Sequence, residues 1–486
     1  MLKEIHHSKS IEKNYEWLLL IFLISSTLIA LITDKVWIMA LPVALFAAVM
    51  AFLNIRWIYF LLIFCIPFSV GLQFGSLTLD FPDEAIAMFF FAIAPVAFLM
   101  NYKKWDFRFL YHPIVFILIA MFFLSILATI NSTNVLLSIK YLLAKGWYLV
   151  AYFACTALFL RSVADVRKMS WFAVIACLLT VLYVMSRHAA DGFSFVSINK
   201  MVGPFYSNHV SYAVQIVVIV PFLWFLWRQA KGKSMLRWFL IGLLALFIVA
   251  TYFSYTRAAI LTLVLSIGFY FVIRMKLVKW FYWAGVIGAV IGTAYLVDDD
   301  HFFTLAPDYN KTITQTNFDD LLSATYNMED ISTMERLYRW VAARYMIPDR
   351  PLLGVGPNNF YDTYKPYTLN SFRTYVSKNP EQSTVHSYLL LLMIEQGVFA
   401  ALLYLALIYY AFVTVQRLYH SVKNRAEKDM IIAAGLCFFN LVMVLLINDV
   451  VESDKEGSFF YISLAIIAAF HFRWLKSQEI SQMKKA

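Results

Sequence analysis

The residues best suited to chemistry are a few cations and one histidine at the ends of long apolar segments. Arg257 lies in the sequence SYTRAAIL, between two apolar runs that are separated by hardly any loop. An arginine at a membrane boundary is costly unless it is paired, reaches the interface or faces water, so it is a functional hypothesis by default. A guanidinium binds phosphate through two parallel N–H groups, and the expected ligand is therefore an anion. The alternative is a turn arginine that reaches the interface.

Further arginines follow in the sequence STMERLYRWVAARYMIPDRPLLGVGPNNF. Arg336 and Arg339 are three residues apart and share one face of the helix predicted there, whereas Arg344 lies on a different part of it. These arginines could extend an anion site. The alternative is that they form surface salt bridges with the twelve Asp and Glu residues of 298–385, which would contribute little to stability.

His386 lies in STVHSYLLLLMIEQGV, where the chain re-enters an apolar run after its longest hydrophilic stretch. An imidazole that is neutral above a pKa of about 6.5 can take a proton from a hydroxyl group. Glu395 follows nine residues later on the same predicted helix. The alternative is a capping or interfacial histidine. The arginines and His386 fall on one predicted side of the membrane, which favours a shared site.

Two lysines interrupt an apolar run in SIKYLLAKGWY. Lys140 lies close enough to the end of the run for its ammonium group to reach the interface. Lys145 lies deeper and needs a partner or a wet cavity. The two lysines either widen the anion site or are structural, and the sequence leaves both interpretations open. Asn208, after GPFYS, is predicted to cap a helix.

Motifs for metal and nucleotide chemistry are missing from the sequence. We find no Walker A sequence, no GxGxxG between a strand and a helix, no HExxH and no carboxylate pair with metal-ligand spacing. The acidic residues at 298–300 are best interpreted as a solvated loop start. The four cysteines lie in apolar runs and are predicted to pack there. The sequence therefore predicts chemistry without a metal or another cofactor.

The elements that must position these residues are membrane-spanning helices. Of the 486 residues, 62% are hydrophobic and 14% are charged, against about 25% charged in soluble domains. Long apolar runs recur along the chain, and a chain in lipid must satisfy its backbone hydrogen bonds internally, which favours helices. We predict an all-α polytopic membrane protein of about fourteen transmembrane helices. The runs are 17–33, 36–53, 57–71, 83–100, 113–130, 138–160, 169–186, 209–227, 237–254, 257–273, 279–297, 386–413, 430–448 and 458–474.

The basic residues predict how these helices cross the membrane. We count 25 of the 40 Lys and Arg residues in segments on one side, which is the bias expected of cytoplasmic segments. The net charge of +10 is thereby assigned to topology and not to a nucleic-acid partner. Both termini are then cytoplasmic. The chain is expected to divide into transmembrane helices 1–11 (1–297), one large extracytoplasmic loop with short helices (298–385), and transmembrane helices 12–14 with a cytoplasmic tail (386–486).

The large loop is predicted to hold a helix over 332–347. Pro348 and Pro351 should end this helix, and Gly354, Gly356 and Pro357 should form a turn after it. The loop is also rich in tyrosine and tryptophan, whose flat faces and polar edges suit sugar rings.

Three motifs, in this order, give the chain a resemblance to a known family. SYTRAA (254–259), ERLYRWVAARYMIPDRPLLGVGPNNF (335–360) and HSYLLLLMIEQGV (386–398) resemble motifs of the bacterial O-antigen ligase and O-antigen polymerase superfamily. Family members often have Asn after the motif histidine, where this chain has Ser387, and ligases usually have twelve spans.

The resemblance implies an inverting, metal-independent glycosyltransferase of the GT-C type in the bacterial inner membrane, with its active site facing the periplasm. Its donor would be an undecaprenyl-pyrophosphate-linked glycan and its acceptor lipid A–core or another glycan, with membrane lipid around it. By position, His386 would be the general base. Arg257 and Arg336 would bind the donor pyrophosphate, and Arg339, Lys140 and Lys145 are further candidates for that site.

Ligation of O-antigen to lipid A–core is the leading interpretation within this family. An O-antigen or exopolysaccharide polymerase and a protein O-oligosaccharyltransferase share the same donor and base, and one sequence does not separate the three acceptors. A transporter or flippase of lipid-linked glycans is an alternative of another class. It would favour broken helices at matching positions in two repeated halves, and we find no such repeat.

Overall fold

The computed structural model describes residues 55–74, 77–101, 103, 106–306, 330–373, 377 and 384–483, and short pieces between 21 and 33. The predicted run 36–53 lies outside the described residues, and only helical pieces of the run 17–33 are described. The division of the chain at 297/298 and 385/386 stays a prediction.

Eleven helices in the described part of the chain are long and apolar enough to cross a bilayer, which takes about 20 residues. The prediction of a helical polytopic membrane protein is confirmed. The helices are α4 (Asp83–Asn101), α5 (Pro113–Ile130), α6 (Val135–Tyr148) continued by η5 (Leu149–Ala154) and α7 (Cys155–Phe159), α8 (Val163–Ala190), α10 (His209–Gln229), α11 (Ser234–Phe253), α12 (Arg257–Arg274), α13 (Val278–Val297) continued by η6 (Asp298–Leu305), α18 (Val398–Ser421), α19 (Arg425–Leu445) and α20 (Asp454–Met483).

Shorter elements join these helices. The predicted run 57–71 is only partly helical: α3 (Ile55–Cys65) and η2 (Ile66–Phe68) lead into strand β1 (Val70–Phe74), which pairs antiparallel with β2 (Leu77–Phe81). The apolar composition of the run does not reveal this change from helix to strand. The remaining elements are η4 (Phe107–Tyr111), α9 (Ile198–Met201), α15 (Ile331–Asp349), α16 (Phe360–Thr363), η7 (Lys365–Tyr367), η8 (Asn370–Phe372), α17 (Tyr388–Gln396) and η9 (Val450–Glu452).

Side-chain caps fix where several helices begin. The side chain of Ser162 accepts from the backbone N–H of Asp165, whose own side chain accepts from the N–H of Ser162, so α8 starts with a capping box. Asn208 accepts from the N–H of Ser211 at 2.9 Å and caps α10, as predicted. Such a cap contributes about 1 kcal/mol, and it fixes the position at which each helix enters the bundle.

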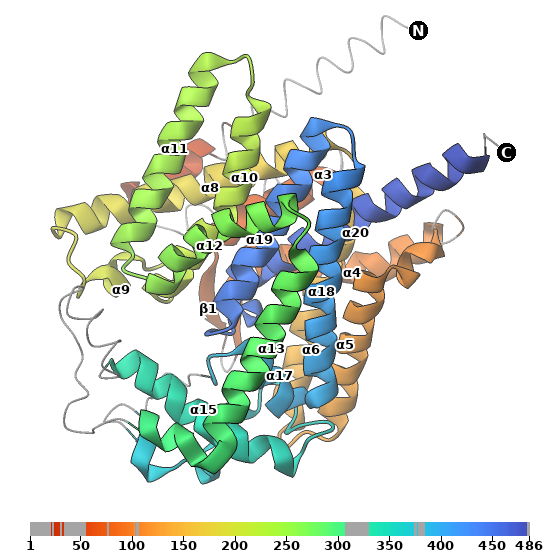
Figure 1. Ribbon diagram of the computed structural model, residues 1–486. Helices are drawn as coiled ribbons and strands as arrows, with labels where there is room; N and C mark the ends of the chain where they lie inside the picture. The colour runs from red at the N-terminus through yellow and green to blue at the C-terminus, as the bar shows by residue number, and fades with distance from the viewer. Residues whose placement is uncertain are drawn as a thin grey trace, which may run out of the picture.

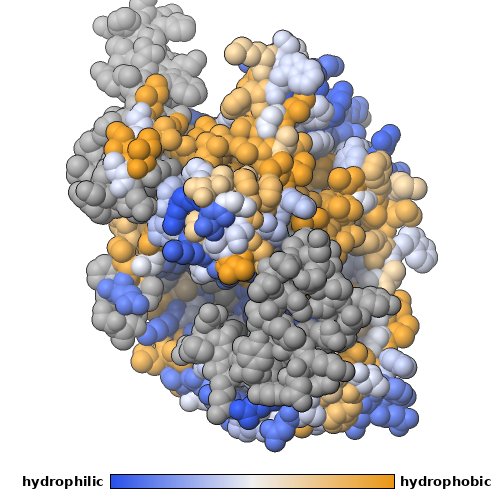
Figure 2. Space-filling model, turned by 90° about the vertical axis from the view of Figure 1, so that its left-hand side faces the viewer, coloured by the Kyte–Doolittle hydropathy of each residue, from blue (hydrophilic) through white to orange (hydrophobic). Residues whose placement is uncertain are grey.

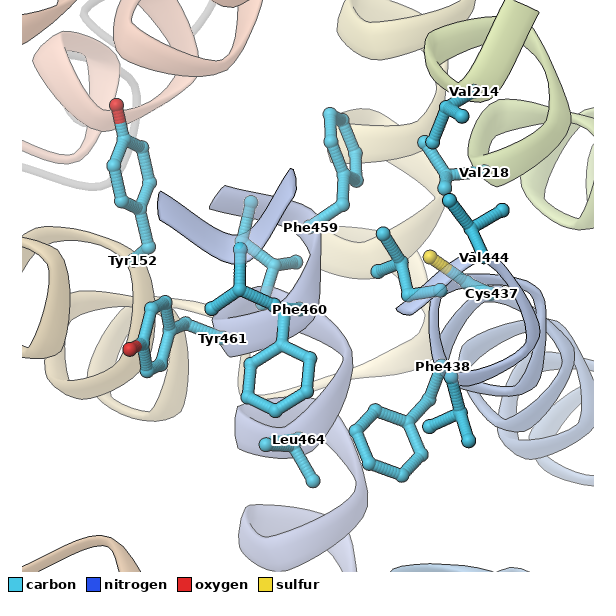
Figure 3. Packing of buried hydrophobic residues seen from close by; sticks show 14 of the residues in the cluster. Tyr152, Val214, Val218, Cys437, Phe438, Val444, Phe459, Phe460, Tyr461 and Leu464 are labelled. Atoms are coloured by element: carbon cyan, nitrogen blue, oxygen red, sulfur yellow. The ribbon is translucent and has the colours of Figure 1, made fainter. Parts of the chain in front are cut away.

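The hydrophobic core lies between α10, α19 and α20. Figure 3 shows Val214 and Val218 of α10, Cys437 and Phe438 of α19, and Phe459 and Phe460 of α20 packed around this centre. All four cysteines are buried and free, as their apolar surroundings predict. α13 buries only Val278 and exposes apolar side chains along its length, as expected of a helix that faces lipid.

The bundle has two different ends. Figure 1 shows α15 lying across one end, which we call the loop face, while the α10–α11 and α18–α19 turns lie at the other end, the opposite face. In Figure 2 hydrophobic residues cover much of the middle of the molecule around one hydrophilic patch, and hydrophilic residues lie at its upper end and along its lower end, where the loop face lies. This distribution agrees with a protein whose middle is surrounded by lipid.

The predicted continuous run 386–413 is wrong in one respect, because the helix breaks at Gly397. α17 ends at Gln396 and α18 starts at Val398, and Gly397 between them has a φ of +85°. The 350–357 segment packs into the break: the N–H of Val398 donates to the carbonyl of Pro351 at 2.9 Å, and the N–H of Val355 donates to Ile394 at 2.9 Å. The run is therefore two helices held apart by a loop.

Candidate functional site

Arg257 occupies the first position of α12, directly after a tight turn. Tyr255 in that turn has a φ of +57°, and Thr256 is the N-cap residue. The Arg257 guanidinium forms an ion pair with Asp330, with Nη2 at 3.0 Å from Oδ2. The Arg257 side chain is 27% exposed and that of Asp330 only 2%. An arginine at the membrane boundary is thus paired with a carboxylate from the loop helix, and part of its surface stays accessible.

Asp330 in turn starts α15. Its carboxylate accepts from the N–H of Thr333 at 3.1 Å and from the Thr333 hydroxyl at 2.7 Å, which is the arrangement of an N-cap. The predicted helix over 332–347 is confirmed, since α15 spans Ile331–Asp349. One carboxylate therefore connects the first turn of α15 to the first residue of α12.

Arg336 and Arg339 lie one and two turns along α15. Nε of Arg336 donates to the carbonyl of Ile447 at 3.2 Å, and its Nη1 donates to the Ser332 hydroxyl at 2.6 Å. The Arg339 side chain is 1% exposed and pairs with Glu335 at 3.1 Å, while its Nε has no hydrogen-bond partner among the described residues. Burial and the nearby Arg257 and Arg339 charges lower the pKa of Arg336, and Asp330 opposes them. Three positively charged guanidinium groups, those of Arg257, Arg336 and Arg339, therefore lie near one another where they are partly shielded from water.

His386 lies beside these arginines with an unusual backbone. Its φ is +54°, in the left-handed region that a non-glycine residue seldom occupies. Burial, Arg336 and Arg339 lower the pKa of His386 to about 3. The imidazole is therefore neutral at physiological pH.

Two contacts hold the segment around His386. The indole Nε1 of Trp340, on α15, donates to the carbonyl of Val385 at 3.0 Å. The N–H of Tyr388 donates to the carbonyl of Asn448 at 3.2 Å, in the segment that follows α19. Loop helix and bundle thus fix the histidine from two sides.

The predicted site residues fall into two groups. Arg257, Arg336, Arg339 and His386 lie at the loop face: Arg257 pairs with Asp330 at the start of α15, Arg257 and Arg339 act electrostatically on Arg336, and Arg336 and Arg339 act on His386. Lys145 and Lys140 lie apart, on α6. Lys145 is buried and donates to the Tyr141 hydroxyl at 2.6 Å, and Tyr141 in turn accepts from Gln396 at the C-terminal end of α17. His386 precedes the other end of α17, so about 13 Å of helix separates the two groups.

Two other residues singled out in the sequence have structural contacts. Arg344 pairs with Asp300 at 2.8 Å and lies over the Phe302 ring, so the surface ion pair is the better interpretation for this arginine. The Glu395 carboxylate accepts from the backbone N–H groups of Asn358 at 2.8 Å and Phe360 at 3.0 Å. It holds the turn after Gly356, whose φ is +101°, as the predicted turn requires.

Sequence reasoning missed three residues of this site. Asp330 carries a weak signal, since Asp before a helical pattern is a common N-cap. Thr384 and Asp449 carry none. The Thr384 hydroxyl hydrogen-bonds to Asp449 and also accepts from the N–H of His386 at 3.4 Å. Burial raises the pKa of Asp449, while Thr384 and the Arg339 charge lower it. These contacts join the α19–α20 connection to the backbone of His386.

Comparison with known proteins gives a match over this part of the chain. Residues 242–405 match the family model described as O-antigen ligase, and the match includes Arg257, Arg336, Arg339 and His386. This match supports the resemblance to the O-antigen ligase superfamily that the sequence motifs predict. No curated protein matches it.

The chemistry that this site can perform follows from charge and protonation. Fixed guanidinium groups stabilise negative charge that develops on a phosphate, and they need no reorganisation when it appears. A neutral imidazole next to them can accept a proton from a hydroxyl group. Among the described residues, no group of three or more His, Cys, Asp or Glu side chains could hold a metal ion. Cations and a base that are gathered in one place suit a glycosyltransferase whose leaving group is an anion.

Proposed function

We propose that this chain is a glycosyltransferase of the O-antigen ligase type, which transfers a glycan from undecaprenyl pyrophosphate to an acceptor hydroxyl group. The observation that carries the proposal is that Arg336 and Arg339 lie near His386, and that Arg257 is joined to the same helix through Asp330. A diphosphate leaving group is already activated and calls for several cations at one place. The membrane-spanning helices provide the lipid contact that a polyprenyl chain needs.

The reaction would proceed as a direct displacement. His386 takes the proton of the acceptor hydroxyl while the acceptor oxygen forms a bond to the anomeric carbon of the donor. The bond from that carbon to the diphosphate oxygen breaks, and its electron pair leaves with the diphosphate. Arg336 and Arg339 stabilise the charge that develops on the leaving group, and Arg257 binds the other phosphate. Attack opposite the leaving group inverts the configuration of the carbon.

The donor-binding role fits the hydrogen bonds that the arginines already make. Arg336 and Arg339 are held by Ile447, Ser332 and Glu335, so ordering them on binding costs little. Nε of Arg339 is buried and has no hydrogen-bond partner among the described residues. Lys145 would serve a more distant part of the donor, since it contacts Tyr141, which binds Gln396 at the other end of α17. Lys140 lies on the same helix, α6, and would share that role.

We further propose that the loop face is periplasmic and the opposite face cytoplasmic, in the bacterial inner membrane. The basic segments that predict a cytoplasmic location include the α10–α11 and α18–α19 turns, and both turns lie at the opposite face. Lipid A–core is the proposed acceptor, which makes the reaction an O-antigen ligation.

The test is a product analysis with the purified full-length protein in lipid nanodiscs. A polyprenyl-pyrophosphate glycan is supplied with lipid A–core, with a second copy of the donor, or with a serine-containing peptide, and products are identified by mass spectrometry. Glycosylated lipid A–core with release of polyprenyl pyrophosphate is the expected result. Lengthened glycan on the donor would identify a polymerase, and a glycopeptide would identify a protein glycosyltransferase. Unchanged donor in every arm would refute the transferase.

A further inference from the structure

A second concentration of positive charge lies at the opposite face, far from the site described above. The last turn of α10, the first turn of α11 and the first turn of α19 frame a cavity of about 390 Å³, which we call the basic pocket. Its lining includes Arg228, Lys231 and Arg237 from around the α10–α11 turn, and Asn424, Arg425 and Asp429 from the start of α19. Ligand pockets begin at about 300 Å³, so the basic pocket is large enough for a phosphate-bearing group.

The charges around the basic pocket do not balance. Four cations line it against one carboxylate, and Arg228 already pairs with that carboxylate, with Nε at 3.2 Å from Oδ2 of Asp429. Lys231, Arg237 and Arg425 form no ion pair with any described residue. Three cations around one hollow repel one another unless an anion lies between them.

The pocket is also built to present its charges. The Arg237 guanidinium lies 4.9 Å from the centroid of the Trp227 ring, and that of Arg228 lies 5.6 Å from the centroid of Trp224. Asn424 caps α19 by accepting from the N–H of Ala426 at 2.9 Å, so the positive end of this helix dipole adds to the field. Stacking and capping reduce the entropy that these groups would lose on binding.

Membrane topology alone does not explain this arrangement. The sorting of basic residues to the cytoplasm requires them near the ends of spans, but it does not require them to line a common cavity. The cations of the basic pocket come from two turns nearly 190 residues apart in the chain. Their convergence therefore calls for a ligand.

The neighbouring surface indicates what kind of ligand this is. Met235, Trp238 and Phe239 of α11 are exposed apolar residues next to Arg237 in the sequence. Such side chains at a helix end lie in the interface of a bilayer, where tryptophan is enriched. We propose that the basic pocket binds the phosphate of an anionic phospholipid, with Lys231, Arg237 and Arg425 as its cationic contacts. A free phosphate ion shares this chemistry and is the other possible source.

The test uses the full-length protein in nanodiscs that contain phosphatidylcholine with a minor fraction of phosphatidylglycerol. Lipid that stays bound through detergent exchange is measured by native mass spectrometry, for the wild type and for the pair Arg237→Gln with Arg425→Gln. The matched control is Arg274→Gln with Lys279→Gln, which removes two cations from the α12–α13 turn, outside the lining of the basic pocket. Each cation near an anionic lipid raises the affinity for that lipid by roughly a factor of five. The double variant of Arg237 and Arg425 should therefore retain about 25-fold less phosphatidylglycerol than the wild type. The control should retain it.

A second arm identifies the source of the phosphate. Thermal unfolding is followed in detergent with inorganic phosphate added. If phosphate stabilises the wild type but not the pocket variants, and all of them retain the same amount of lipid, the pocket binds a free phosphate ion. Equal lipid retention and equal phosphate response in the wild type, pocket and control proteins would overturn the proposal. If the double variant of Arg237 and Arg425 does not fold, the single variant Arg425→Gln, at an exposed position, is compared with the wild type in the same two measurements. None of these measurements depends on glycan transfer.

Discussion

Arg257 and Asp330 join the membrane bundle to the loop helix through one ion pair of 3.0 Å. The two residues are 73 positions apart, and the carboxylate serves both as partner of the arginine and as cap of α15. Because Arg336 and Arg339 lie on α15, the same contact sets their position relative to Arg257. The geometry of the three guanidinium groups therefore depends on Asp330.

Asp330 offers a way to separate its two roles. Asparagine still caps a helix but carries no charge, whereas alanine does neither. We expect Asp330→Asn to keep α15 folded and to lower glycan transfer about tenfold, because the Arg257 guanidinium loses its position. Asp330→Ala should in addition raise hydrogen exchange in residues 331–339, since the cap contributes about 1 kcal/mol. Wild-type transfer by Asp330→Asn would show that the ion pair does not position Arg257.

Arg336 and Arg344 provide a matched comparison on one helix. Lysine keeps the charge but loses the planar pair of donors that binds a phosphate. We expect Arg336→Lys to reduce kcat/KM for the donor by tenfold or more, and Arg257→Lys to behave alike. Arg344→Lys should stay near the wild-type value, because Arg344 makes a surface pair with Asp300 and lies over the Phe302 ring, away from His386. Equal effects at the two positions would contradict the proposed donor site.

The protonation of His386 predicts an unusual pH dependence. In the free protein its pKa is lowered to about 3, so the imidazole stays neutral and kcat/KM should be flat from about pH 5 to pH 8. A bound diphosphate adds negative charge beside the imidazole, which favours its protonated form and raises its pKa. The acid limb of kcat should therefore lie at a higher pH than that of kcat/KM. An ordinary histidine base would instead lose kcat/KM below about pH 6.5.

Replacement of the histidine is the control for this profile. His386→Ala should lower kcat by about 100-fold or more while the protein stays folded. If the alanine variant transfers glycan at the wild-type rate, His386 is not the base.

The sequence predicted the membrane-spanning helices better than the contacts between them. Apolar runs and hydrophilic turns revealed most spans, because composition alone decides what enters lipid. The break between α17 and α18 at Gly397 was not predicted, because glycine is tolerated within membrane spans. Only the packing of the 350–357 segment explains the break. The partners of the cations were not predicted either. Asp330 is far from its partner Arg257 in the sequence, and Tyr141, the partner of Lys145, is one of many tyrosines. Such pairs depend on tertiary structure, which no local pattern encodes.

Thr384 is expected to act as a positioning residue for His386. Its hydroxyl accepts from the His386 N–H and bonds to Asp449, so it supports the positive φ of the histidine. Thr384→Val keeps the shape but removes the hydroxyl. We expect kcat to fall about tenfold while KM for the donor stays unchanged, because the arginines are untouched. Thr384→Ser should restore kcat, and a valine variant with wild-type kcat would rule out this role.

Gly397 is expected to be the least replaceable glycine of the loop face. Its φ is +85°, and a Cβ there would collide with the carbonyl of Leu352, so both backbone strain and a clash oppose any side chain. Strain of this kind alone costs about 1–3 kcal/mol. Gly397→Ala should therefore lower the melting temperature, and it should also reduce transfer, because relief of the clash moves α17 and with it the segment that carries His386. Gly292→Ala is the matched control, since nothing lies within 4 Å of its added Cβ and alanine favours a helix. The control should melt at or above the wild-type temperature and transfer normally. If the two variants melt alike, the 350–357 segment does not lock the α17–α18 break.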